Sequence, residues 1–533
     1  MAESSVLDVI TSHFAQTLPF SPYVESILCV VFGLVLFGYV LDNYGFLDSR
    51  EPPKLRSSFP LVGHVMGMGK RHTQFFDDLY KKNGMAIATL PMLGGKMYAV
   101  WDIALIQSGL KSKTMSFDAI MIQHAQGLLG LSNKSLKLSR DGMLADLMHV
   151  TKPILAGEAL ARINAQVLNH AAIVLNEIGT RKAYEIPDFY DWVQTTATVA
   201  TTEALYGEAN PFSRDKGLVD DVWSFEAGIR RLSLNILPSV TARHALHARE
   251  RLVEAIAALF DETPDHKTEL PDLTRRRLEV IRSHGITDSR EAARVEVALL
   301  HGATVNTVPS LFWTLVHVFA RPDLVATIRN EALPLVKFVS ATPGGENEAH
   351  FPIKLLDTAC PLLLSTYREV TRLANRAIST RWVMEDTLVS DAHGRQYLFR
   401  ADTTVMMPAT AHSSADVWGS DADEFQPQRF LDWKDKASRE RHAAYMPFGG
   451  GKHLCPGRNL AKAEILGLAV ALTLAFEMED AASPGRPIRV PEIRAARMGQ
   501  GVGKPVDLGT GKKLAVRFRT RKGWENIKWK FVL

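Results

Sequence analysis

The chain has 533 residues, of which 46% are hydrophobic and 23% charged, and its formal net charge is +4 at pH 7. These values are typical of a globular chain and exclude wholesale disorder, collagen-like structure and a multi-span membrane protein. No long basic run lies outside the C-terminal tail, which argues against nucleic acid as a partner. The three cysteines are too few for a disulfide framework or a four-thiolate zinc site, so each needs its own explanation.

An apolar segment of 19 residues occupies positions 23–41. At 1.5 Å per residue, such a helix is just long enough to cross a hydrocarbon core about 30 Å thick. Positive charge follows the segment, at Arg50, Lys54 and Arg56, and none precedes it. The positive-inside rule therefore predicts a lumenal N-terminus, residues 1–22, and a cytosolic body.

Two alternatives stay open for this segment. A cleaved signal peptide needs a positively charged region before its apolar core, and residues 1–22 contain no Lys or Arg. A buried helix of a globular domain has a compatible length. The proline-rich stretch 42–58 is typical of a stiff spacer between an anchor and a folded body. We therefore expect an anchor, a hinge and one folded domain over residues 59–533.

Most of the chain after the hinge has apolar residues at three- and four-residue spacing, which predicts amphipathic helices. Examples are residues 250–262, 323–333 and 459–477. Alternating apolar residues predict strands in two places, at about 380–407 and at 514–519. The expected fold is mainly α with small β-sheets, preceded by one N-terminal transmembrane helix.

Residues 448–457 read FGGGKHLCPG and place Cys455 just before a predicted apolar helix, whose N-terminal dipole favours a thiolate. Gly451 and Gly457 remove side chains, so a flat ligand can approach the backbone. Phe448 offers an aromatic surface, and His453 can donate a hydrogen bond to an anionic periphery. Cysteine thiolate is one of the axial ligands of haem iron, so the loop predicts a haem site with Cys455 bound to the iron.

The alternative for Cys455 alone is a buried structural cysteine, the usual fate of a free thiol. The pattern Phe-x-x-Gly-x-x-x-Cys-x-Gly is more specific, because it should occur by chance about 6 × 10⁻⁴ times in a chain of this composition. The stretch resembles the haem-binding loop of the cytochrome P450 family. That resemblance implies the cytochrome P450 fold, haem b as cofactor and an oxidoreductase that incorporates oxygen from O2.

Two further motifs follow in the order expected of that family. Glu369 and Arg372, at a helical i,i+3 spacing, resemble its Glu-x-x-Arg pair and begin 86 residues before the cysteine. Arg429, in the run Pro-Gln-Arg-Phe, resembles the residue that binds this pair. A second Glu-x-x-Arg pattern, Glu291 to Arg294, is expected on a solvated helix face instead.

A long central helix is expected over about residues 291–319. In most family members its middle holds an acid followed by Thr, which help to deliver protons during oxygen activation, and here Val305 and Asn306 occupy those positions. Asn306 can hydrogen-bond an oxygen ligand, but it cannot titrate. Pro309 should kink the helix beside it. Alternatively, Asn306 only satisfies a backbone group that this kink frees.

The run Asn306, Thr307, Pro309, Phe312 and Trp313 is similar to the branch that holds sterol 7α-hydroxylases, bile-acid 12α-hydroxylase and prostacyclin synthase. A fungal enzyme of secondary metabolism fits the same resemblance. Asn306 and Thr307 are therefore the candidate catalytic residues. Because the branch includes both oxygen-inserting enzymes and a peroxide isomerase, monooxygenation and reductase-independent rearrangement both stay open.

Four weaker signals complete the picture. No Trp-x-x-x-Arg pair, which often faces a haem propionate, occurs between residues 102 and 160, and Arg381 is the candidate in its place. By family analogy, the apolar stretch 234–240 is a membrane-dipping substrate entrance, with core packing as the alternative. Cys360 is expected in the core. The basic residues that are candidates for docking an acidic electron donor are Lys452, Arg458 and Lys462. A solvated face or contacts with the haem propionates explain any one of them equally well.

Taken together, the resemblance implies a single-pass membrane protein of the endoplasmic reticulum with a cytosolic catalytic domain. Its substrate would be a lipophilic small molecule such as a sterol, terpenoid or polyketide. Electrons would come from NADPH-cytochrome P450 reductase, because the chain has no flavin domain of its own. One rival is a haem-thiolate isomerase or dehydratase. The other is a non-enzymatic haem-binding membrane protein, against which the intact motifs argue.

Overall fold

The computed structural model describes residues 26–27, 29–33, 36–37, 48–57, 62–93, 95–262, 270–340, 347–409, 413–433, 439–494, 496, 499–506 and 513–533. The predicted lumenal segment, 1–22, and most of the predicted anchor, 23–41, lie outside these residues; the described residues of the anchor are helical and exposed. Within the described ranges, no helix is by itself long and apolar enough to cross a membrane. One pair bent by 106°, Ser289–Phe319 with Pro322–Leu335, meets the length and composition requirements.

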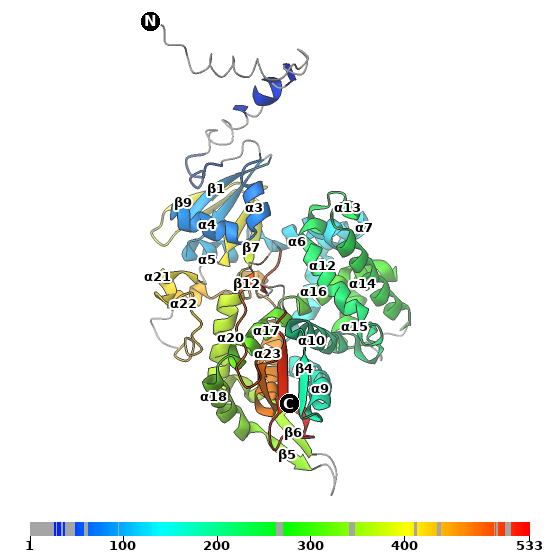
Figure 1. The fold of residues 1–533 in the computed structure, drawn as a ribbon. Helices are drawn as coiled ribbons and strands as arrows, with labels where there is room; N and C mark the ends of the chain where they lie inside the picture. The colour runs from blue at the N-terminus through cyan, green and yellow to red at the C-terminus, as the bar shows by residue number, and fades with distance from the viewer. Residues whose placement is uncertain are drawn as a thin grey trace, which may run out of the picture.

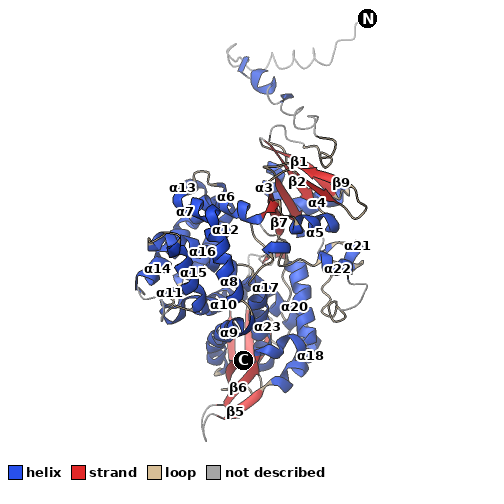
Figure 2. Ribbon diagram, turned by 180° about the vertical axis from the view of Figure 1, so that it is seen from behind, coloured by secondary structure: helices blue, strands red, loops and turns tan. Residues whose placement is uncertain are grey.

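A β-rich lobe follows the N-terminal segment and lies beside a helical lobe, as both views show (Figures 1 and 2). Its elements are α3 (Val65–Arg71), α4 (Gln74–Asn83), β1 (Ile87–Met92), β2 (Gly95–Val100), α5 (Ile103–Lys111), β3 (Met115–Ser116), β7 (Ile378–Val383), β8 (Thr387–Ser390), β9 (Gln396–Phe399) and β10 (Thr404–Pro408). The five-stranded sheet has the order β1-β2-β10-β7-β3, with only the β2–β10 pair parallel. The strands predicted over residues 380–407 are thus present as β7 to β10.

Both faces of this sheet are covered, which explains why β1 is almost continuously buried. Phe75 and Phe76 of α4 pack with Leu90 on one face. Leu105 and Leu110 of α5 belong to the apolar cluster on the other face. Helix α5 is therefore held firmly on the sheet, with its C-terminal end toward the centre of the molecule (Figure 1).

The helical lobe consists mainly of amphipathic helices that pack on one another (Figure 2). They are α6 (Phe117–Leu129), α7 (Asn133–Leu138), α8 (Leu144–Ile154), α11 (Pro211–Arg214), α12 (Gly217–Leu234), α13 (Pro238–Thr241), α14 (Arg243–Glu262), α15 (Asp272–Ser283) and α16 (Ser289–Thr304). The predicted helix 250–262 forms the second half of α14. The stretch 234–240 contains the end of α12 and the start of α13, and its apolar residues are 53–76% exposed, so the core-packing alternative is wrong.

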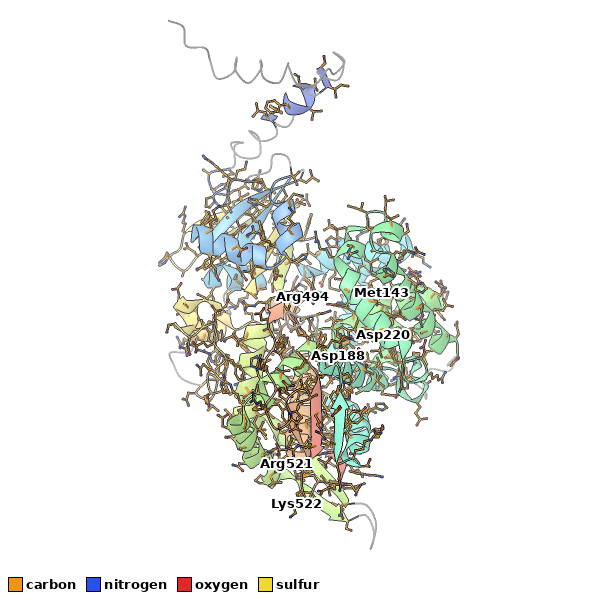
Figure 3. The ribbon with its side chains drawn as sticks, in the orientation of Figure 1. Met143, Asp188, Asp220, Arg494, Arg521 and Lys522 are labelled. Atoms are coloured by element: carbon orange, nitrogen blue, oxygen red, sulfur yellow. The ribbon has the colours of Figure 1, made fainter. Side chains whose placement is uncertain are left out.

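The remaining helices and small sheets lie at the centre and in the lower part of the molecule (Figure 1). The helices are α9 (Gly157–Gly179), α10 (Phe189–Tyr206), α17 (Thr307–Phe319), α18 (Pro322–Ala332), α19 (Leu356–Ala359), α20 (Pro361–Ala374), α21 (Ala415–Trp418), α22 (Arg439–Ala444) and α23 (Arg458–Ala475). The strands are β4 (Ala183–Ile186), β5 (Lys337–Ser340), β6 (Asn347–Pro352), β11 (Phe476–Asp480), β12 (Ile493–Arg494), β13 (Lys504–Pro505), β14 (Val516–Thr520) and β15 (Lys528–Val532). Arg494 of β12, labelled in Figure 3, lies near the centre of the molecule.

Two central helices determine where the loops that precede them can lie. Every residue of α17 except His317 is buried, and α23 is buried from Ala463 to its end. Helix α23 stops at Ala475, so the prediction of helix up to Glu477 is wrong. Phe476–Asp480 pairs instead with β14 as an antiparallel strand. The ladder of long-range hydrogen bonds therefore overrides the local helical pattern.

The predicted central helix begins at Ser289 and reaches Phe319, but its backbone ladder is interrupted at Val305 and Asn306, between α16 and α17. Pro309 cannot donate a backbone hydrogen bond, so the carbonyl of Val305 loses its usual partner one turn earlier. The interruption leaves Asn306 exposed between the buried Val305 and Thr307. A break beside Asn306 therefore agrees with the prediction.

Candidate functional site

Cys455 lies at the end of a closed loop that leads into α23. Its backbone N–H donates to the carbonyl of Phe448 over 3.1 Å, and the N–H of Leu454 donates to the carbonyl of Gly451 over 3.2 Å. Arg458 donates from Nη1 to the Cys455 carbonyl at 3.0 Å. The thiol is free and half-buried, and Phe448 packs on the core. The loop thus presents one sulfur atom at the start of a rigid helix.

Glycines in the loop allow the end of α5 to approach it. Gly451 has φ +64°, and a Cβ at this position would lie 1.9 Å from the carbonyl oxygen of Leu110. At Gly450, a Cβ would lie 3.0 Å from the Leu110 side chain. At Gly457, a Cβ would make only an ordinary contact of 3.9 Å with the Cys455 sulfur. Protein packing therefore accounts for Gly451, while the expected role of Gly457 toward a flat ligand stays a prediction.

The electrostatic setting of Cys455 combines two opposing effects. Burial raises the pKa of its thiol, although the backbone N–H groups of Gly457 and Arg458 and the charge of Arg458 act in the opposite direction. The helix N-terminus therefore favours the thiolate, as predicted, but burial of the thiol outweighs this effect. A bound metal cation deprotonates a coordinating thiol outright, which would supply the missing stabilisation.

Arg381 of β7 lies beside the loop and is only 3% exposed. Its Nη1 donates to the carbonyl of Thr380 at 2.8 Å, and its Nη2 lies 3.5 Å from the carbonyl of Gly450. Its buried Nε has no hydrogen-bond partner. Burial also lowers the pKa of Arg381 to about 10. A guanidinium that is buried without a carboxylate at ion-pair distance favours an anionic ligand.

His453 faces residues that the sequence did not indicate. Its Nδ1 lies 3.4 Å from a carboxylate oxygen of Asp118, and its ring contacts that of Phe117 edge-on at 5.8 Å. The same Phe117 ring lies under the Arg381 guanidinium at 5.8 Å. The His453 Nε2 is buried without a partner. The Phe117 ring at the start of α6 therefore contacts both Arg381 and His453, although no local motif marks Phe117 or Asp118.

Glu369, Arg372 and Arg429 come together in the interior. The Glu369 carboxylate accepts from Nε of Arg372 at 2.7 Å and from Nε of Arg429 at 2.9 Å. The side chains of Glu369 and Arg372 are fully buried, and that of Arg429 is 5% exposed. Arg429 also bridges to Asp421 at 3.0 Å, while Arg372 donates to the carbonyl of Ala422 at 2.6 Å. This network pins α20 to the segment that precedes the cysteine loop.

The second Glu-x-x-Arg pattern has a different environment. Glu291 and Arg294 are 16% and 15% exposed, so their assignment to a solvated helix face is wrong. Glu291 accepts the N–H of Ser132 at 2.8 Å, and Arg294 pairs with Glu250 of α14 at 2.6 Å. These two residues connect α16 to neighbouring helices and contact none of the candidate site residues.

Near the break in the central helix, the structure distinguishes the two candidate catalytic residues. Asn306 is exposed, whereas Thr307 is 7% exposed at the start of α17. Among the described residues, the Asn306 side chain forms no hydrogen bond, so the alternative that it satisfies a freed backbone group is wrong. A Cβ at Gly302, one turn earlier, would meet nothing within 4 Å. Open space therefore borders this face of α16.

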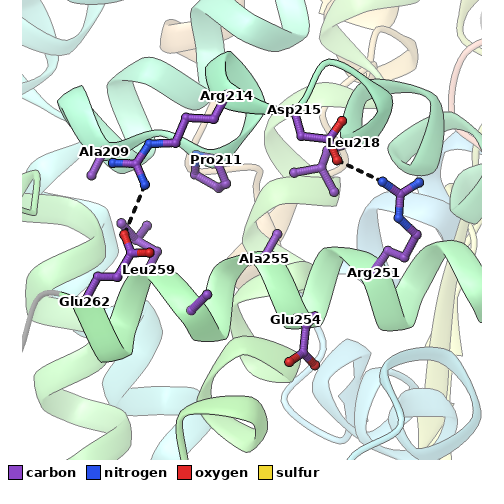
Figure 4. Close-up of a pocket in the computed structure, with 11 residues that line it drawn as sticks. Ala209, Pro211, Arg214, Asp215, Leu218, Arg251, Glu254, Ala255, Leu259 and Glu262 are labelled. Carbon is purple, nitrogen blue, oxygen red and sulfur yellow. Dashed lines mark hydrogen bonds and ion pairs between the residues drawn. The ribbon is translucent and has the colours of Figure 1, made fainter.

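A surface depression of about 360 Å³ lies elsewhere, among α11, α12 and α14 (Figure 4). Its rim holds the ion pairs Arg214–Glu262, at 3.0 Å, and Arg251–Asp215, at 2.9 Å. All four of these side chains are at least 42% exposed, so the pairs contribute little stability. None of the predicted site residues lines this depression.

Comparison with known proteins shows the family to which the chain belongs. The sequence model of the family Cytochrome P450 matches residues 52–490. The chain is a cytochrome P450. A cytochrome P450 monooxygenase from Gibberella zeae is 36% identical over 490 residues, which cover 91% of this chain and 92% of the relative. The cytochrome P450 monooxygenase nodJ of Hypoxylon pulicicidum is 28% identical over 513 residues, covering 95% and 96%.

The predicted branch is also represented among the relatives of this cytochrome P450. Cholesterol 7-alpha-monooxygenase from Cricetulus griseus is 21% identical over 477 residues, covering 86% of this chain and 92% of the relative. The predictions of family, haem b cofactor and oxygen-incorporating oxidoreductase are confirmed. Members of the family generally receive electrons from a redox partner and act on lipophilic substrates.

The residues of this cytochrome P450 fit haem b. The loop supplies one soft ligand atom, the Cys455 sulfur, at the start of α23. Within the described part of the chain, the buried Arg381 Nε and His453 Nε2 have no hydrogen-bond partner, which favours an anionic ligand beside them. Gly302 borders open space on the central helix. A cysteine sulfur, a buried guanidinium and room beside the helix together match a flat, anionic, iron-containing cofactor.

Proposed function

We propose that this protein is a membrane-anchored haem-thiolate monooxygenase that oxidises a lipophilic small molecule. Cys455 would ligate the haem iron through its sulfur, and Arg381 and His453 would bind the anionic groups of the cofactor. Phe448, Gly451 and the neighbouring Gly457 shape the loop. The observation that carries the proposal is the half-buried free thiol held at the start of α23 beside two buried nitrogens without partners.

Haem b held by thiolate supplies the oxygen activation. The chain's own residues orient the substrate, exclude water and supply hydrogen bonds. Asn306 can donate from its amide to an oxygen atom, whereas Val305 has no titratable group. Protons must therefore arrive by a route other than a side-chain acid at position 305. Glu369, Arg372 and Arg429 act structurally, by fixing the segment that leads to the cysteine loop.

The test replaces the sulfur. Cys455→Ser keeps the size of the side chain but removes the soft ligand, so the ferrous carbon monoxide complex should lose the absorption band typical of thiolate-bound haem. Cys360→Ala is the matched control, because Cys360 is a fully buried core thiol. It should keep the band of the parent. A Cys455→Ser protein with an unchanged band refutes the proposal.

The substrate class is proposed from the relatives and from the apolar surroundings. Fungal monooxygenases and a cholesterol 7-alpha-monooxygenase among the similar proteins support a sterol, terpenoid or polyketide, in a pathway of fungal secondary metabolism. Binding of a substrate near haem iron changes the absorption of the ferric protein. Titration with representatives of the three classes tests this proposal, and no response to any of them contradicts it.

Single-pass anchoring in the endoplasmic reticulum is part of the proposal, with residues 1–22 lumenal and 23–41 spanning the bilayer. The apolar composition of the segment supports it, as do the exposed Leu234, Ile236, Leu237 and Val240 around α13. Deletion of residues 1–58 should move most of the protein from the microsomal to the soluble fraction. If the full-length and the truncated protein divide equally between the microsomal and soluble fractions, the proposed anchor is contradicted.

NADPH-cytochrome P450 reductase is the proposed electron donor. Lys452 is exposed on the cysteine loop, and Lys462 pairs with Asp357 on the neighbouring surface. Arg458 is directed to the Cys455 carbonyl instead. Lys452→Glu should therefore slow reduction by the reductase and weaken the dependence of this rate on salt, with reduction by dithionite unchanged. An unchanged enzymatic rate would remove Lys452 from the docking surface.

The alternative is a haem-thiolate isomerase or dehydratase that rearranges an oxygenated substrate without reductase. It is favoured by the buried Val305 in place of an acid and by the exposed amide of Asn306. Turnover with and without reductase and NADPH separates the two functions. Product formation at full rate without an electron source supports the alternative and excludes the monooxygenase.

A further inference from the structure

A glycine-rich turn far along the chain packs against the break in the central helix. A Cβ at Gly501 would lie 2.4 Å from Oδ1, 3.0 Å from Cγ and 3.4 Å from Nδ2 of Asn306. All three atoms of the Asn306 amide group therefore lie close to the position that a Cβ of residue 501 would occupy. Gly501 does not have a positive φ, whereas Gly499 in the same turn does, at +91°. The requirement for glycine at position 501 is therefore steric.

Hydrogen bonds fix the turn in place. Its residue Gly501 accepts the backbone N–H of Arg376 at 2.9 Å, and Gly503 donates to the carbonyl of Ala374 at 2.9 Å. The indole Nε1 of Trp313, in α17, donates to the carbonyl of Gly503 at 2.7 Å. The turn is therefore tied both to the end of α20 and to the helix that follows the break. It cannot easily move away from a new methyl group.

The Asn306 side chain is held differently. Its backbone carbonyl accepts the hydroxyl of Ser310 at 2.7 Å, but its amide forms no hydrogen bond within the described part of the chain. The residue is exposed, although Val305 and Thr307 on either side are buried. The space over Gly501 that a Cβ would fill is consequently where the amide lies. Rotation of the Asn306 side chain is the least costly response to crowding.

We infer that Gly501 is a positioning residue for Asn306. The missing side chain at position 501 lets the amide occupy its place beside the break, and any larger residue displaces the amide while the fold persists. Residue 501 thereby determines whether Asn306 can reach an oxygen atom of the substrate or of a small ligand in the site. This inference rests on the proposed function, since Asn306 acts there at the reaction site.

A double-mutant cycle on the full-length holoenzyme tests the inference, with Gly501→Ala, Asn306→Ala and the double variant. The first measurement is the midpoint of thermal unfolding. Overpacking by one methyl group should lower it by about 1–3 °C in the Gly501→Ala variant. In the Asn306→Ala background the clashing atoms are absent, so the same methyl should lower the midpoint by less than about one third of that amount. Gly179→Ala is the control, because a Cβ at Gly179 would meet nothing within 4 Å.

The second measurement is the infrared C–O stretching band of the ferrous carbon monoxide complex, which responds to a nearby amide. Gly501→Ala should move this band toward its position in Asn306→Ala, and the double variant should match Asn306→Ala. Additive effects of the two substitutions, or a parental band in Gly501→Ala, overturn the inference. A parent that binds no carbon monoxide overturns the proposed function instead, and the thermal cycle then still decides whether the contact exists.

Discussion

Glu464 offers a quantitative test of the core of this protein. Its side chain lies in α23, is 1% exposed and, among the residues that the structure describes, has one hydrogen-bond partner, the Thr201 hydroxyl, at 3.1 Å. That hydroxyl also donates to the carbonyl of Ala197 at 2.8 Å, and its single hydrogen cannot serve both acceptors. A protonated Glu464 can donate to the hydroxyl oxygen instead. Burial accordingly raises the pKa of Glu464 to about 8.

The sign and size of the effect follow from proton linkage. The unfolded chain ionises this carboxyl near pH 4.5, while the folded protein keeps its proton up to about pH 8. The contribution of Glu464 to stability is therefore most favourable below pH 4.5 and is lost progressively as the pH rises to 8. At about 1.4 kcal/mol per pH unit, the loss between pH 5 and pH 8 is about 3–4 kcal/mol.

The substitution Glu464→Gln should remove this pH-dependent loss of stability, because the glutamine amide has nearly the same shape as the carboxyl group and cannot ionise. At an unfolding entropy of about 2.1 cal/mol/K per residue, the midpoint of the parent should fall relative to Glu464→Gln by about 3 °C between pH 5 and pH 8. Differential scanning fluorimetry over this range measures the difference. Glu385→Gln, at an exposed site, is the control and should follow the parent. If the difference in unfolding midpoint between the parent and Glu464→Gln does not change with pH, the reasoning is refuted.

Two further substitutions test the site. Gly451→Ala should abolish haem incorporation, because the new Cβ would lie 1.9 Å from the backbone oxygen of Leu110 in the helix that supports the loop; the ratio of haem to protein absorbance measures this loss. Glu369→Gln should lower the free energy of unfolding by about 3–5 kcal/mol, because the buried Arg372 would lose the carboxylate of Glu369 and Arg429 would keep only that of Asp421. Denaturant unfolding checks this value, and a loss below about 1 kcal/mol would show that the network does not stabilise the fold.

The parts of the site that lie within short stretches of sequence could be predicted. The cysteine loop and the Glu369–Arg372 pair depend on neighbours that are few residues apart, so glycine content, helix position and i,i+3 spacing are informative. The supporting contacts come from distant segments. Asp118 lies beside His453, and Gly501 lies beside Asn306. No periodicity or spacing in the sequence records such pairs, because they depend on how whole elements pack.

The two Glu-x-x-Arg patterns show where this limit lies. Both place the carboxylate and the guanidinium on one helical face, and both lie in helices that the structure contains. Glu369 is fully buried between two guanidinium groups, whereas Glu291 accepts a backbone N–H while its arginine pairs with Glu250 of another helix. Local geometry is thus the same, and the difference arises from the third group that tertiary packing supplies. A motif of two residues therefore specifies an orientation, and only the fold decides whether that orientation builds a site.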